Sequence, residues 1–352
     1  MTIFVALFHY TMTHTIIEWY LNHKRELPWR ETQDPYLIWI SEIILQQTRV
    51  AQGYDYYLRF ITQFPTIKNL AEASEEDVLR MWQGLGYYSR ARNIHATAKD
   101  IMTRFKSSFP TSYDDIISLR GIGPYTAAAI ASFAFRLPYA AVDGNVYRVI
   151  ARLFGIATPI DTNEGKKLFQ AIADEMMDHK RPDLFNQAMM EFGAMQCVPK
   201  SPDCPICPLN DKCIALDKNL IDELPAKQGK TKVRSRYFHF LEIASENELW
   251  IEQRQSEDIW KGLFQLPLIE TTENTPLLNT DLSVITGNAK IESFILCKEY
   301  KHVLSHQHLY CRFYKAEGKN IDLHKPYIKI RREELNQYAI PRIIEKYFEE
   351  NS

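Results

Sequence analysis

Apolar residues recur with two different periods along the chain. In the first part they recur at helical spacing, and residues 38–50, 126–134 and 145–154 each predict a helix. In the last part, short runs such as YFHFLEIA, ELWIEQR and HLYCRFYKA are typical of strands. The polar, basic stretch between these parts is typical of a linker. The predicted parts are a mainly α domain at 1–217, a linker at 218–235 and an α+β domain at 236–352.

Composition sets loose bounds on function. The 352 residues suffice for two domains with ordinary cores, and 45% hydrophobic with 24% charged residues is usual for a soluble globular protein. The net charge of −2 gives no general attraction to nucleic acid, so a nucleic-acid contact needs a local basic surface. Since no run of about 18 apolar residues occurs, we expect no membrane span. The apolar start, residues 1–9, lacks a basic segment and a cleavage site, so we expect no secretory signal.

The segment LRGIGPYTA, residues 119–127, lies between two predicted helices. Gly121 and Gly123 permit a tight turn that brings the backbone close to another surface, and the free N–H groups of the following helix can bind a phosphate. Such a hairpin holds DNA through the phosphate backbone without selecting a sequence. A plain helix–turn–helix connection with a glycine cap is the alternative interpretation.

Two carboxylates occupy unusual places in the helical part. Asp143 stands directly before the predicted helix 145–154, where an aspartate usually caps the helix. Glu42 is flanked by Ile43 and Ile44, and a charge in such an apolar run is costly unless it is paired or functional. If Glu42 is partly buried, its pKa is raised and the carboxyl group can hold a proton near neutral pH. The other interpretation places Glu42 on the exposed side of an amphipathic helix.

Four of the six cysteines gather in one short segment with the spacing C-x6-C-x2-C-x5-C. Without an export signal, such a group indicates a metal site rather than disulfides. Zinc and iron–sulfur clusters both accept four thiolates, and a group without metal is a third alternative. The four candidate ligands are Cys197, Cys204, Cys207 and Cys213, whereas Cys297 and Cys311 stand alone.

The hairpin, the aspartate and the cysteine segment, in this order and spacing, resemble the signature of helix-hairpin-helix glycosylases. Endonuclease III-type members place a lysine where this chain has Tyr125, and that lysine cuts the strand through a Schiff base. The segments LPWR (27–30), DPY (34–36), SE (41–42) and LQQT (45–48) resemble the adenine DNA glycosylase family. The resemblance therefore implies a monofunctional glycosylase. The alternatives are a bifunctional glycosylase/lyase for oxidised pyrimidines and a non-enzymatic DNA-binding module.

The resemblance implies a role for each candidate residue in the removal of adenine. Glu42 would protonate adenine N7, and the charge of Asp143 would stabilise the oxocarbenium-like transition state at the sugar, with Tyr125 close by. Two of the DNA-binding residues would wedge into the duplex as the base leaves the stack. The wall of the adenine pocket would comprise Trp29, Arg30 and Gln187, and the DNA contacts would comprise Gln47 and Tyr87 as wedges with Thr48, Gly121 and Gly123.

The last part of the chain resembles the Nudix-like domain of adenine DNA glycosylases through GLFQLP (262–267) and HVLSH (302–306). No Nudix catalytic box of clustered glutamates occurs, so we expect no pyrophosphate hydrolysis. Ser305 and His306 would contact 8-oxoguanine, although Leu304 replaces the aromatic residue usual in the family. The implied function is the removal of adenine paired with 8-oxoguanine or guanine, in base excision repair.

The same resemblance implies the cofactor and the partners. The clustered cysteines would hold one 4Fe–4S cluster with a structural role, which presents basic residues such as Lys200 and Lys212 to the DNA backbone. The implied partner is duplex DNA that contains adenine opposite 8-oxoguanine or guanine, and no membrane is involved. We expect a monomer and, for a bacterial protein, a place in the cytoplasm in association with the nucleoid.

Overall fold

The computed structural model describes residues 3–229, 233–245, 247–287, 289, 291–318, 321, 323 and 326–351. The chain divides into two compact units. The helical unit comprises residues 1–71 and 96–229, and the sheet unit comprises residues 72–95 and 230–352. Within the described residues, no helix is long and apolar enough to cross a membrane.

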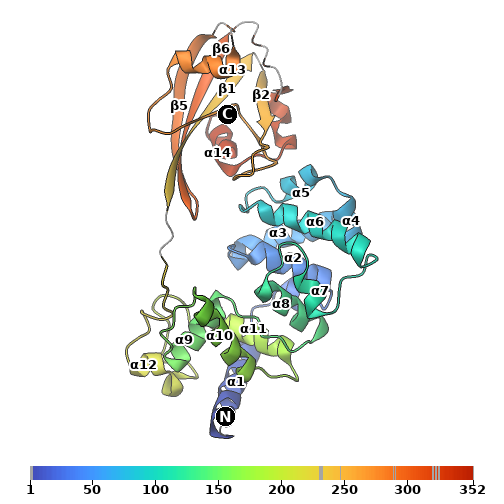
Figure 1. The fold of residues 1–352 in the computed structure, drawn as a ribbon, viewed down its shortest axis with the longest axis vertical. Coiled ribbons are helices and arrows are strands. Elements are labelled where there is room, and N and C mark those ends of the chain that lie inside the picture. Colours follow the sequence, from blue (N-terminus) through green and yellow to red (C-terminus); the bar gives the residue numbers. More distant parts are fainter. Residues whose placement is uncertain are drawn as a thin grey trace. The chain divides into compact units, whose positions relative to one another are not determined.

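The helical unit is built around one large apolar core. Helices α1, α9, α10 and α11 contribute Ile16, Ile150, Phe169 and Phe192 to this core, and Figure 1 shows these helices side by side. The predicted helices at 126–134 and 145–154 are confirmed as parts of α8 and α9. The elements that begin in this unit are α1 (Ile3–His23), η1 (Pro28–Arg30), α2 (Pro35–Leu45), α3 (Val50–Gln63), α4 (Ile67–Glu72), α7 (Tyr113–Ile117), α8 (Pro124–Phe135), α9 (Gly144–Phe154), α10 (Asn163–Met176), α11 (Pro182–Met195), η2 (Asn210–Lys212) and α12 (Ile214–Asp217).

Residues 38–50 do not form the single helix that their apolar pattern predicts. Helix α2 ends at Leu45 and α3 begins at Val50. Between them Gln47 has a φ of +59°, in the left-handed region that a right-handed helix cannot contain. Neither glycine nor proline marks this turn, so the sequence pattern gave no sign of it.

The predicted linker, 218–235, is only partly a connection. Residues 218–229 belong to the helical unit, where Leu224 is buried in the core. The Ile160 N–H donates to the Ala226 carbonyl at 3.0 Å, and the N–H groups of Gln228 and Gly229 donate to the Asp161 carboxylate. Residues 230–232 lie outside the described residues, and strand β1 already begins at Arg234.

The sheet unit confirms the predicted α+β character of the last part. Its strands follow the order β3-β2-β1-β6-β5, with β4 also paired to β1 and β7 to β2. The β1–β6 pair is parallel and the other pairs are antiparallel. The elements are β1 (Arg234–Ser245), β2 (Glu248–Gln253), β3 (Phe264–Gln265), β4 (Leu268–Thr271), η3 (Asn279–Leu282), α13 (Ser283–Thr286), β5 (Ile291–Val303), β6 (Gln307–Gly318), β7 (Tyr327–Arg331), η4 (Arg332–Gln337) and α14 (Arg342–Glu350).

A segment from the N-terminal half of the sequence completes the sheet unit. It contains α5 (Glu75–Met81) and the first turns of α6 (Ser89–Arg104). The Arg92 guanidinium donates to the Lys261 carbonyl at 2.7 Å, and the Gln83 amide donates to Glu345 of α14 at 3.1 Å. Residues 72–95 are thus attached to the loop before β3 and to the last helix, a contact that no local sequence pattern predicts.

Candidate active site

A cavity of about 450 Å³ opens among the helices of the helical unit. This volume lies in the range of small-molecule sites in proteins. Its lining comes from η1, α2, the turn between α2 and α3, α8, the start of α9 and one face of α11. The predicted site residues that line it are Trp29, Arg30, Glu42, Gln47, Thr48, Tyr125, Asp143 and Gln187.

Glu42 lies in this cavity and is buried, with 6% of its surface exposed, so the interpretation as an exposed helix position is wrong. Helix α2 places it there, since Asp34 caps the helix and a nearly continuous apolar run buries it. The Tyr125 hydroxyl donates to Glu42 Oε2 at 2.7 Å. Burial raises the pKa of Glu42 to about 7, the charge of Asp143 adds to this, and the Tyr125 hydrogen bond and Arg30 oppose it.

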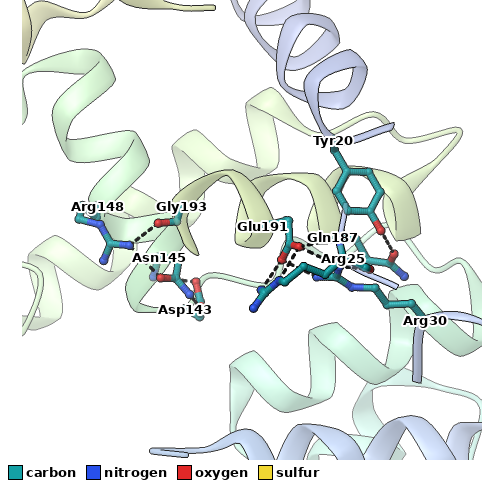
Figure 2. Close-up of polar contacts among 9 residues, drawn as sticks. All are labelled: Tyr20, Arg25, Arg30, Asp143, Asn145, Arg148, Gln187, Glu191 and Gly193. Atoms are coloured by element: carbon teal, nitrogen blue, oxygen red, sulfur yellow. Dashed lines mark hydrogen bonds and ion pairs between the residues drawn. The ribbon is translucent and has the colours of Figure 1, made fainter. Parts of the chain in front are cut away.

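Asp143 caps α9, as its position before the helix predicts, and it also lines the cavity. Its Oδ1 accepts from the N–H groups of Asn145 at 2.9 Å and Val146 at 2.8 Å, at the start of α9. Its Oδ2 accepts from the Asn145 side chain at 2.7 Å, as Figure 2 shows. Burial raises the pKa of Asp143, and the hydrogen bonds and Arg148 oppose that rise.

Tyr125 lies in the same cavity as both carboxylates and is bonded to one of them, Glu42. It occupies the first turn of α8, directly after the predicted hairpin, where Gly121 has a φ of +79° and Gly123 caps the helix. Burial and the charges of both Glu42 and Asp143 raise the pKa of Tyr125, so its hydroxyl remains a donor. The hairpin glycines themselves do not line the cavity.

Aromatic and polar side chains form the rest of the cavity wall. Trp29 is buried and packs edge-to-face on Tyr57 with ring centroids 5.1 Å apart. Arg30 pairs with Glu191 at 2.7 Å. Glu191 was missed by the sequence analysis, although it carries the same signal as Glu42, a carboxylate inside an apolar helix.

The remaining DNA-contact candidates belong to the sheet unit. Ser305 and His306 are exposed in the turn between β5 and β6. Tyr87 is 48% exposed, has a φ of +49°, and its hydroxyl forms a hydrogen bond with the Ser305 hydroxyl. The structure therefore brings Tyr87 and Ser305 together within the sheet unit, whereas Gln47 belongs to the helical unit.

The four clustered cysteines follow α11 in a loop of the helical unit, and all four thiols are half-buried. Burial raises the pKa of Cys204, Cys207 and Cys213, and the charges of the neighbouring cysteines add to this rise. The Arg152 guanidinium donates to Cys197 Sγ at 3.5 Å. Within the described residues, no three Cys, His, Asp or Glu side chains are grouped around a position for one metal ion.

Comparison with known proteins assigns the family. The family model for HhH-GPD superfamily base excision DNA repair proteins matches residues 40–174, and a NUDIX domain model matches residues 239–350. The adenine DNA glycosylase of Buchnera aphidicola subsp. Baizongia pistaciae (strain Bp) is 38% identical over 299 residues, which cover 84% of this chain and 83% of that protein. The chain belongs to the adenine DNA glycosylase family. It is thus an enzyme of base excision repair that hydrolyses N-glycosidic bonds, and the non-enzymatic alternative is wrong.

This adenine DNA glycosylase family member is also similar to a eukaryotic relative and to solved structures. The human adenine DNA glycosylase is 40% identical over 211 residues, 57% of this chain and 38% of that protein. A solved thermostable thymine-DNA glycosylase superposes with a TM-score of 0.56 at 27% identity, covering 60% of this chain and 97% of that one. An endonuclease III–DNA complex, at 23% identity and a TM-score of 0.53, shares the fold.

We expect base excision by this adenine DNA glycosylase family member to slow as the pH rises through about 7, the pKa of Glu42. Only the protonated carboxyl group can donate a proton, and that form is lost above this pKa. Tyr125→Phe removes a hydrogen bond that favours the charged form, so the pKa of Glu42 should rise and the falling limb should move to higher pH. Single-turnover excision rates measured across this pH range locate the falling limb of the wild type and that of Tyr125→Phe.

The matched control is Tyr36→Phe, which removes a buried hydroxyl that donates to the Phe64 carbonyl away from the cavity. Its pH profile should coincide with that of the wild type. A falling limb that stays in place in Tyr125→Phe, or moves equally in Tyr36→Phe, would show that Glu42 is not the group that titrates.

Proposed function

We propose that this chain removes adenine from duplex DNA in which adenine is paired with 8-oxoguanine or guanine. The observation that carries the proposal is that a buried carboxyl group, Glu42, and a half-buried one, Asp143, line one cavity, with the Tyr125 hydroxyl bonded to Glu42. The reaction needs an acid for the leaving base and a negative charge for the sugar. Burial raises the pKa of Glu42 to about 7, whereas three hydrogen bonds to Asp143 favour its charged form.

The proposed reaction proceeds by acid-assisted loss of the base. Glu42 gives its proton to adenine N7, the N9–C1′ bond breaks, and its electron pair passes to the adenine ring. The carboxylate of Asp143 stabilises the positive charge that develops on the sugar. A water oxygen then bonds to C1′ and loses its proton to solvent, which leaves an abasic site and free adenine.

The supporting observation for a monofunctional enzyme is Tyr125. A lyase needs an amine at the sugar to form a Schiff base, and the tyrosine hydroxyl beside Glu42 cannot supply one. The bifunctional alternative therefore lacks its nucleophile at the position where the related lyases carry it.

The choice of the opposite base is assigned to the turn between β5 and β6. Adenine is a normal base, so a pocket for adenine alone would damage intact DNA, and selectivity must come from the base opposite. 8-Oxoguanine differs from guanine by an N7–H and an oxygen at C8. The exposed Ser305 hydroxyl can accept from that N7–H, and His306 lies beside it in the same turn.

The decisive assay uses a duplex with one adenine opposite 8-oxoguanine, incubated with the protein and then analysed with and without hot alkali. We expect strand cleavage only after alkali, since an abasic site is alkali-labile. Immediate cleavage would identify a lyase, and an intact strand under both conditions would contradict the proposed activity. The same duplex with guanine, compared between wild type and Ser305→Ala/His306→Ala, tests whether the turn selects the opposite base.

We further propose that the four clustered cysteines hold one 4Fe–4S cluster. Four thiols that lie near one another in one loop are the donor set for such a cluster. The C-x6-C-x2-C-x5-C spacing, similar to the iron–sulfur loop of this family, favours the iron–sulfur cluster over zinc. When bound, the cluster would tie the loop together and present Lys200 and Lys212 to the DNA backbone.

We expect protein purified without chelators to contain about four iron atoms per chain and to be coloured. Cys207→Ser should lose most of this iron, because one of the four ligands is removed. Cys297→Ser and Cys311→Ser are the matched controls, since these two cysteines lie in the sheet unit, and both should keep the iron. Elemental analysis decides the matter, and stoichiometric zinc with no iron would contradict the cluster.

A further inference from the structure

Two buried residues, Tyr20 on α1 and Glu191 on α11, bond to side chains of the cavity wall. Tyr20 is 2% exposed, and its hydroxyl donates to Gln187 Oε1 at 2.5 Å. Figure 2 shows this pair and Asp143 at different ends of the site. Neither Tyr20 nor Glu191 has been given a role in the reaction so far.

The orientation of the Gln187 amide follows from its hydrogen bond with Tyr20, whose buried hydroxyl must donate to an acceptor. Burial raises the pKa of Tyr20, so the phenol keeps its proton and needs an acceptor. If the amide were turned round, its NH2 group would donate to the phenol oxygen and the buried phenol proton would be left without an acceptor. The hydrogen bond therefore holds Gln187 Oε1 at the Tyr20 hydroxyl, so the NH2 group lies on the other side of the amide. Gln187 is half-buried and lines the cavity.

Glu191 cannot take the place of Gln187 as the acceptor for Tyr20, because its own acceptor positions are filled. The Glu191 carboxylate is buried and accepts from the Arg25 backbone N–H and guanidinium and from two nitrogens of Arg30. Arg30 is thereby held in the cavity wall, and a guanidinium offers donors only. Arg30 is thus engaged with Glu191 and the Arg25 carbonyl. Gln187 Oε1 is engaged by Tyr20, which leaves the NH2 group of Gln187 as the polar group of this side chain that can meet a base.

We propose that Tyr20 is a positioning residue that makes this site selective for adenine, by fixing Gln187 with its NH2 group toward the base. This inference rests on the proposed function. Adenine has an NH2 group on C6 and a lone pair on N1, whereas hypoxanthine has an oxygen on C6 and a hydrogen on N1, and both keep N7 for Glu42. In the proposed reaction Asp143 lies at the sugar, and Gln187 lies at the other end of the side chains that Figure 2 draws. N1 is the ring nitrogen of adenine farthest from the sugar, so we assign N1 to Gln187. An N–H donor there binds adenine and repels hypoxanthine.

The test compares single-turnover excision of adenine and of hypoxanthine from otherwise identical duplexes. In Tyr20→Phe the amide is free to turn and offer Oε1 to the N1–H, so the ratio of adenine to hypoxanthine excision should fall about tenfold, the effect of one hydrogen bond. Tyr36→Phe, which removes an equally buried hydroxyl outside the cavity, should leave the ratio unchanged.

Two further variants separate positioning from simple stability. Gln187→Glu keeps an acceptor for Tyr20 and puts an oxygen where the NH2 group was, so it should lower the ratio as well. In the Gln187→Ala background, adding Tyr20→Phe should change the ratio no further, because Tyr20 acts through Gln187. Equal slowing of both bases in Tyr20→Phe, or additive effects in the double variant, would overturn the inference. No adenine excision by the wild type would instead overturn the proposed function.

Discussion

Asp143→Asn should lower the single-turnover rate of base excision by about 10²–10³-fold while the protein still folds and binds duplex DNA. The asparagine oxygen can keep the two backbone hydrogen bonds at the start of α9, because asparagine caps helices as well as aspartate does. What is lost is the negative charge beside the developing cation on the sugar. The rate measurement is made with enzyme in excess over an adenine:8-oxoguanine duplex, and binding is measured on the same duplex.

The control for this variant is Asp34→Asn. Asp34 caps α2 through a hydrogen bond from the Tyr36 N–H at 2.8 Å, and it does not line the cavity. It should therefore retain wild-type excision. A near-normal rate in Asp143→Asn would show that Asp143 serves only as a helix cap and that its charge has no part in the reaction.

Glu42→Gln should lower the same rate by about 10²–10⁴-fold, the usual contribution of a general acid. The glutamine oxygen can still accept from the Tyr125 hydroxyl, so the fold around the site should persist. Because glutamine has nearly the same size and shape as glutamate, a loss of this size would show that the reaction needs the proton of Glu42. An exposed change on α1, Glu18→Gln, is the control and should leave the rate unaltered.

Stability provides an independent check on the pKa of Glu42. Because burial raises its pKa from 4.5 to about 7, the folded protein holds a proton that the unfolded chain loses, and the free energy of unfolding falls as the pH rises through this interval. Glu42→Gln removes that loss, so its Tm above neutral pH should equal or exceed the wild-type Tm. A clear decrease would show that the charged carboxylate is stabilised in the fold.

The sequence singled out the two carboxylates of the cavity through two different signals. Glu42 places a charge in an apolar helix, and Asp143 follows a glycine-rich hairpin at a fixed interval. Their proximity is a property of the tertiary structure, since α2, α8 and α9 meet only after folding. The sequence analysis expected Tyr125 near the sugar. Its hydrogen bond to Glu42 could not be derived from the spacing of residues in the sequence.

The parts that the sequence did not predict depend on contacts between distant segments. The turn at Gln47 lies within a continuous apolar run, and residues 218–229 look like a linker because their anchors, Ile160 and Asp161, lie elsewhere in the chain. The attachment of residues 72–95 to the sheet unit likewise comes from pairs far apart in sequence. Local periodicity contains no information about such pairs.

The central claim is that Glu42 gives a proton to adenine N7. 7-Deazaadenine has a carbon at that position and cannot accept the proton, although its size and its N1 edge match adenine. Single-turnover excision should therefore be measured for the wild type on two duplexes that differ only in adenine or 7-deazaadenine opposite 8-oxoguanine. The account predicts efficient release of adenine, no measurable release of 7-deazaadenine, and intact binding of both duplexes. Release of both bases at similar rates would contradict the account.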